Sequence, residues 1–266
     1  MSIDPVAANP YSPKNMAAYL AKQCLRGSIT IHGKQQLGEG KGAEYNRLVL
    51  GVLSTIECSQ VGRLLIRSIN RYPSEAVSIA PYSGKHYAQY GRLNAIAIAD
   101  QPETAGHNGK DGRGSTCTVR FSPDDWLTSG VANQGGRVVA VGNRRDEVLH
   151  HELAHALSNL AGKRNSSIAP AGFDTKNEFW AVMVTNIYSS AWNRPLRKDH
   201  GSRASSLKEA EAFFAQYASM VDWMCRDQPV FTRAVAQLDW IPFNPFRESY
   251  RRRETLRVTS SQPLFR

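Results

Sequence analysis

The stretch from Asp146 to Leu157, DEVLHHELAHAL, constrains the fold of this chain more than any other. It contains neither proline nor glycine, and its apolar residues recur at the three- and four-residue spacing of a buried helix. Two histidines in it, His151 and His155, are four residues apart and therefore lie one turn apart on the same helix face. Such a helix has to pack inside a domain, because its apolar side needs a partner surface.

His151 and His155 enclose Glu152 in the pattern HExxH. Two imidazoles one turn apart can bind the same ion, whereas Glu152 is rotated by about 100° from His151 and faces a water molecule beside that ion. A zinc ion with three protein ligands and one open position lowers the pKa of its water to about 7. The motif therefore predicts a Zn²⁺-dependent hydrolase with Glu152 as general base. His150 is out of register and has no predicted metal role.

The third ligand has to come from outside this motif. A third histidine at position 161 is excluded, because Ser158 and Ala161 occupy the positions where that pattern requires glycine and histidine. Glu178 is the leading candidate, because it lies in an apolar helical segment where an unpaired carboxylate would be costly. Asp174, which is also well placed as the N-cap of that segment, and His200 remain alternative ligands.

A hydrolase of this kind also needs a group that holds the oxyanion formed on attack. His200 is the first candidate, because the polar cluster around it follows the ligand helix and can fold back over the metal. Asn186, two turns beyond Glu178, is predicted to support the site. The other oxyanion candidates are Arg197, Tyr188 and, more remotely, Tyr250, and the histidines predicted to lie at the surface are His32, His86 and His107.

Four segments together resemble the zinc-metallopeptidase effector and toxin domains of Gram-negative bacterial secretion systems, with the NleD-like host-directed proteases as distant relatives. The resemblance is clearest over about residues 115–250, and the segments that carry it are His151–Ala156, Phe173–Thr175, Asn177–Tyr188 and Leu196–His200. It implies a gluzincin-like site in which His151, His155 and Glu178 are the ligands and Glu152 is the base. One departure is Asn177, where related domains often have an acid.

The resemblance also implies type III or type VI-like delivery and a protein or peptide substrate in a target cell. A chaperone or an immunity protein is a further expected partner. The N-terminal sequence MSIDPVAANP agrees with this route, because it has neither the charge nor the apolar run of a classical signal peptide. No uncharged apolar run of about 18 residues occurs, so no membrane span is predicted.

The pattern of the whole chain predicts an α+β, zincin-like domain with a small mixed or antiparallel sheet and a mainly helical C-terminal half. The organisation predicted is an N-terminal arm over 1–45 that is partly disordered or serves targeting, a peptidase domain over 46–250 and a basic tail over 251–266. The expected helices are 17–25, 45–56, 61–70, 146–161, 174–191, 206–226 and 228–238, followed by an irregular end, and the expected strands are 28–32, 76–80, 93–99, 115–121 and 136–141.

The net charge of +10 leaves two alternative functions open. Arginines crowd the last twenty residues, and such a tail either binds nucleic acid or an anionic surface or is simply solvated. A basic nucleic-acid-binding protein with structural zinc is one alternative, and a zinc amidase that cleaves cell-wall peptides is the other. A structural zinc site normally has four ligands and needs no general base such as Glu152. The peptidase is therefore the favoured function, and nucleic acid is not the favoured partner.

Overall fold

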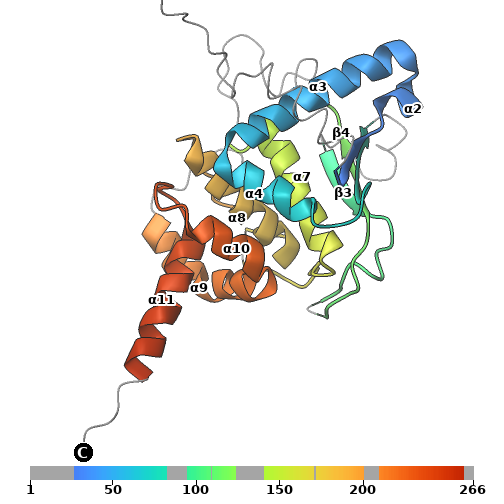
Figure 1. Cartoon of the computed structure of the whole chain (residues 1–266). Helices are drawn as coiled ribbons and strands as arrows, with labels where there is room; N and C mark the ends of the chain where they lie inside the picture. Colours follow the sequence, from blue (N-terminus) through green and yellow to red (C-terminus); the bar gives the residue numbers. More distant parts are fainter. Residues whose placement is uncertain are drawn as a thin grey trace, which may run out of the picture.

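The computed structural model describes residues 27–82, 95–108, 110–123, 141–170, 172–200 and 210–260. Within these residues, eight helices and a four-stranded mixed sheet form an α+β fold (Figure 1), which confirms the predicted class. The helix predicted over 17–25 and all but the last residue of the strand predicted over 136–141 lie outside the described residues. No single helix of the described part is long and apolar enough to cross a membrane.

The sheet has the strand order β1-β2-β4-β3. Strands β1 (Ile29–Ile31), β2 (Val77–Pro81) and β4 (Cys117–Phe121) run parallel, and β3 (Ala95–Ala99) pairs antiparallel with β4 at the edge of the sheet. The sheet is therefore mixed, which is one of the two predicted arrangements. Parallel pairing of β1 with β2 is feasible because the long helical connection between them lets the chain cross over.

Residues 29–45, which belong to the predicted N-terminal arm, carry β1, α2 (Gly33–Leu37) and the first turns of α3 (Glu39–Cys58). Tyr45 is buried, and its hydroxyl donates a hydrogen bond to the carbonyl oxygen of Phe121 at 3.0 Å. The glycines of this stretch allow close contact between the two helices, because a Cβ on Gly42 would lie 2.4 Å from the Cα of Lys34. This part of the predicted arm is therefore built into the fold.

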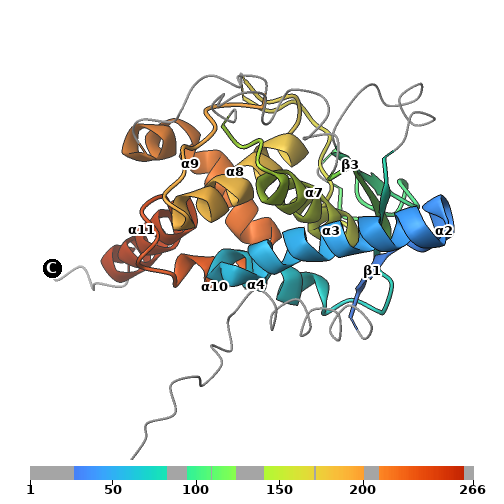
Figure 2. The same ribbon diagram turned by 90° about the horizontal axis from the view of Figure 1, so that it is seen from above.

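Helix α7 (Arg145–Leu160) lies between the sheet and the C-terminal helices, as Figures 1 and 2 show from two directions. It packs against β3 and β4 and also against α3, α4 (Gln60–Ile69) and α8 (Lys176–Ala191). Fourteen of its sixteen residues are buried. A helix buried to this extent carries polar side chains into the interior, and each of them needs a partner or a function.

The two acids at the start of α7 have such partners. Glu147 accepts a hydrogen bond from the backbone N–H of Arg144 at 3.1 Å and another from the hydroxyl of Ser189 at 2.7 Å. Asp146 accepts a hydrogen bond from the hydroxyl of Tyr188 at 2.6 Å. Both acids thus join α7 to α8, and they fix how the two helices that carry HExxH and Glu178 face each other.

The C-terminal part consists of α9 (Ala210–Asp227), α10 (Pro229–Ala236) and α11 (Pro245–Ser260). The prediction of an irregular end after residue 238 is wrong for residues 245–260, which form α11 and include residues 251–260 of the predicted tail. Phe246 and Ser249 of α11 are fully buried and Tyr250 is half-buried, so one narrow face attaches the helix to the body. Its last turns extend away from the rest of the molecule (Figure 1).

Candidate metal centre

Three of the predicted residues meet where α7 faces the first turn of α8. The Nε2 atoms of His151 and His155 are 3.1 Å apart, and each lies 3.3 Å from Oε2 of Glu178. The three ligand atoms all lie within 4.8 Å of one another, close enough to hold one metal ion. Thr175 is the N-cap of α8 and accepts a hydrogen bond from the backbone N–H of Glu178 at 3.2 Å, which fixes Glu178 in that turn. Asp174, predicted as the N-cap, does not have this role.

The chemistry of these atoms fits a zinc ion. Burial lowers the pKa of His151 to about 4, so its ring is neutral and has a lone pair to offer. Oε2 of Glu178 and Nδ1 of His151 are buried and make no hydrogen bond in the structure. Burial opposes a charge on Glu178, but the neighbouring imidazoles of His155 and His151 lower its pKa and keep it ionised. Two imidazoles and a carboxylate are a common donor set for zinc with an open position.

Asn177 contacts the ring of His155 from the other side. Its Nδ2 atom lies 2.8 Å from Nδ1 of His155, and its Oδ1 atom is buried without a partner. A His155 that binds a metal through Nε2 carries its proton on Nδ1, and the amide then has to turn so that Oδ1 accepts that proton. Asn177, at which the sequence departs from the domains it resembles, is therefore in direct contact with His155 and can orient its ring.

Glu152 projects from α7 next to the ligands without belonging to the group of ligand atoms. Burial and, to a smaller extent, the charge of Glu178 raise its pKa to about 7, although His155 and a backbone hydrogen bond at Ala97 act in the opposite direction. Ala97 lies on the edge strand β3, so the carboxylate faces the space between α7 and the sheet. A pKa of about 7 suits a group that accepts and returns a proton at neutral pH.

His200 lies beside the cluster, on its more exposed side. Its Nε2 atom is 3.2 Å from Oε2 of Glu178, and its Nδ1 atom is 2.5 Å from Oδ2 of Asp174. The side chain of His200 is 33% exposed, compared with 9% for His151, so this side of the cluster is the more exposed one. Neither His200 nor Asp174 supplies one of the three ligand atoms that lie within 4.8 Å of one another.

Backbone contacts fix the loop that carries His200. The backbone N–H of His200 donates to the carbonyl oxygen of Gly172 at 2.8 Å, and the guanidinium of Arg197 donates to the carbonyl oxygen of His200 at 2.5 Å. The side chain of Asn186 in α8 bonds to both the N–H and the carbonyl oxygen of Arg197, each at 2.8 Å. Asn186 therefore anchors this loop and does not touch the ligands through any of these bonds.

Two of the oxyanion candidates lie elsewhere. The hydroxyl of Tyr188 donates a hydrogen bond to Asp146, and the Tyr188 ring stacks on the His150 ring with centroids 4.3 Å apart. Tyr250 lies on α11, where its hydroxyl is 3.1 Å from that of Thr232. Of the histidines predicted to lie at the surface, His32 is half-buried and His107 exposed, both outside the cluster, and His86 lies outside the described residues.

The centre thus brings together His151, His155 and Glu178, with Glu152 and His200 next to them. The sequence predicted neither the pairing of His200 with Asp174 nor the contact of Asn177 with His155. No model of a known protein family matches the chain, and no curated protein matches its sequence.

Proposed function

We propose that this protein is a zinc-dependent metallopeptidase in which His151, His155 and Glu178 hold the ion and Glu152 is the general base. The observation that carries the proposal is the convergence of two Nε2 atoms and one carboxylate oxygen within 4.8 Å of one another. When bound, zinc lowers the pKa of a water molecule and polarises the carbonyl group of the substrate. The fold proposed with this function is zincin-like, with the HExxH helix packed against the sheet.

The residues around the ligands supply the remaining chemistry. Glu152 accepts the proton of the attacking water and returns it to the nitrogen of the leaving amine. His200 donates from Nε2 to the oxyanion, because this nitrogen lies beside Glu178 on the exposed side of the centre. Asp174 accepts a hydrogen bond from the Nδ1–H group of His200 and so sets the orientation of the ring. Arg197 and Asn186 hold the loop in place.

A catalytic role is better supported than a structural zinc site. Structural sites are usually closed by four ligands, whereas within the described part of the chain three residues supply this group of ligand atoms. A buried carboxylate with a raised pKa beside the ligands, Glu152, has no purpose in a structural site. The resemblance to secreted effector domains supports a target-cell protein as substrate and type III or type VI-like delivery, and a cell-wall amide would be cleaved by the same chemistry.

The zinc content of the purified protein tests the proposal directly. We expect about one zinc per wild-type chain by inductively coupled plasma mass spectrometry, and a sharp loss in Glu178→Ala. Glu103→Ala is the matched control, because Glu103 is an exposed acid outside the centre, and it should keep its zinc. A folded wild-type protein without affinity for zinc would show that the proposed metal centre is wrong.

The contact between Asp174 and His200 gives a second prediction. We expect Asp174→Asn to lower kcat by about 10–100-fold on a peptide that the wild type cleaves, selected from a proteome-derived peptide library, with unchanged zinc content. His200→Ala should lose at least as much, and the double variant should be no worse than His200→Ala, because the two residues act as one unit. Loss of zinc in Asp174→Asn would instead identify Asp174 as a ligand.

A further inference from the structure

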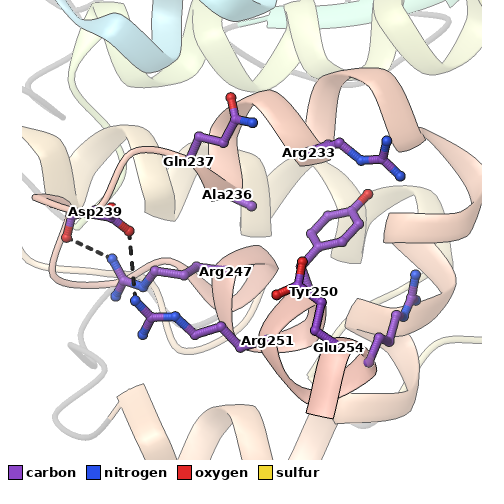
Figure 3. A pocket seen from close by; sticks show the side chains of 9 residues that line it. Arg233, Ala236, Gln237, Asp239, Arg247, Tyr250, Arg251 and Glu254 are labelled. Carbon is purple, nitrogen blue, oxygen red and sulfur yellow. Dashed lines mark hydrogen bonds and ion pairs between the residues drawn. The ribbon is translucent and has the colours of Figure 1, made fainter. Parts of the chain in front are cut away.

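A pocket of about 630 Å³ lies between α10 and α11, and none of its lining residues belongs to α7 or α8 (Figure 3). This volume lies within the range of pockets that bind small molecules. Its lining is dominated by charge, with two acids, Asp239 and Glu254, facing four arginines, which are Arg233, Arg247, Arg251 and Arg253. The proposed peptidase chemistry makes no use of these residues.

Tyr250 is the centre of this arrangement (Figure 3). The guanidinium carbon of Arg233 lies 5.7 Å from the centroid of its ring, and that of Arg253 lies 5.6 Å from the same centroid. The hydroxyl of Tyr250 points to the body of the protein, where it lies 3.1 Å from the hydroxyl of Thr232. A guanidinium held over an aromatic ring keeps the N–H groups at its edge available for a ligand.

The four arginines differ in how far the protein itself uses them. Arg247 donates hydrogen bonds to the carbonyl oxygens of Asp239 and Ile241, at 2.9 and 3.1 Å, and is a structural residue. Arg253 donates to the carbonyl oxygen of Asp222 at 2.6 Å. These two arginines therefore have part of their donors occupied.

The guanidinium groups of Arg233 and Arg251 make weaker contacts with the protein. Both are exposed, and among the described residues no carboxylate forms an ion pair with Arg233. The contacts of Arg251 with carboxylates of the described residues are longer, 3.7 Å to Asp239 and 3.4 Å to Glu248, whereas strong charge-assisted bonds are about 2.7–2.9 Å long. The pocket thus presents guanidinium groups from two helices, and the positive charge of these groups is incompletely neutralised.

We infer that this pocket binds the phosphate groups of a polyphosphorylated ligand, with Arg233 and Arg251 as the principal contacts. Planar guanidinium groups match phosphate bidentately, and several of them around one hollow suit a ligand with more than one phosphate. Two guanidinium groups lie over the ring of Tyr250, so it does not offer the open stacking surface that single-stranded nucleic acid uses. A free polyphosphorylated molecule and a lipid headgroup share this chemistry.

Isothermal titration calorimetry of the full chain with sodium tripolyphosphate tests the inference. We expect measurable binding by the wild type and a loss of affinity of about tenfold or more in Arg233→Gln/Arg251→Gln, because two charge-assisted contacts are removed. Arg71→Gln/Arg113→Gln is the control, since it removes the same charge at exposed arginines outside the pocket. Thermal melts should show both double variants folded.

Sedimentation with phosphatidylcholine vesicles, with and without phosphatidylinositol bisphosphate, distinguishes the two sources. Sedimentation that requires this lipid and the two arginines identifies a headgroup, whereas tripolyphosphate binding without sedimentation identifies a soluble ligand, and both support the pocket. The inference is overturned if the wild type does not bind tripolyphosphate, or if the control variant loses as much affinity. It is also overturned if the variants lose only binding to an oligonucleotide, which would assign the charge to nucleic acid.

Discussion

Replacement of Glu152 by glutamine is expected to abolish peptide hydrolysis while zinc stays bound. The amide cannot accept a proton, and a positioned general base contributes about 10²–10⁴-fold to the rate. The fold should tolerate the change, because glutamine has nearly the same shape and Glu152 is a buried group whose pKa is already raised to about 7. The measurements are kcat/KM on a peptide that the wild type cleaves, zinc content and the melting temperature.

Glu57→Gln is the matched control for this variant. Glu57 is a buried glutamate on α3, and burial raises its pKa too, but it lies outside the metal centre. It should keep wild-type activity, so that a loss confined to Glu152→Gln reports on the base and not on the removal of a buried carboxylate. Full turnover by Glu152→Gln would show that the general-base assignment is wrong.

The pH profile of the wild type follows from the same residue. A base has to be deprotonated to act, so kcat/KM rises with pH as Glu152 ionises. A bound cation favours the charged carboxylate, and the midpoint of the rise should therefore lie below the value of about 7 that burial gives without it.

The part of the centre that could be predicted from the sequence is the part that depends on local geometry. His151 and His155 meet because four residues make about one turn of helix, whatever the rest of the fold does. Glu178 was predicted from the cost of a carboxylate in an apolar helix, which is a statement about burial. The contact of Asp174 with His200 depends on how a loop returns to the start of α8, and no sequence spacing encodes that path.

In the fold, too, features set by local sequence could be predicted, whereas features set by contacts between distant segments could not. Alternating apolar residues predicted β4 within two residues of its start, but the order β1-β2-β4-β3 depends on contacts between distant segments. Glycine disfavours helices, so the sequence pattern predicts no helix over 33–42, although close contact between α2 and α3 requires the small residues of this stretch. The sequence of α11 is rich in arginine and has few apolar residues, so its helical pattern is weak, although the helix packs against the body through a narrow face around Phe246.

Zinc is expected to raise the melting temperature of the chelator-treated protein by about 10 °C. A ligand at about 1,000 times its Kd stabilises the folded state by about 4 kcal/mol, and in a domain of this size 1 kcal/mol corresponds to about 2–4 °C. The structural reason is that the centre brings two imidazole nitrogens to 3.1 Å from each other beside a buried carboxylate oxygen. A cation between them binds all three atoms, whereas without it Oε2 of Glu178 is buried and makes no hydrogen bond.

The comparison of two histidine variants makes this expectation specific to the centre. His151→Ala removes one ligand, so its melting temperature should respond little to zinc at the same concentration. His107→Ala removes an exposed histidine outside the cluster and should keep the full response. A shift of equal size in His151→Ala would mean that zinc stabilises the protein elsewhere. The convergence of His151, His155 and Glu178 would then not be the metal centre, and the proposed peptidase would lose its main support.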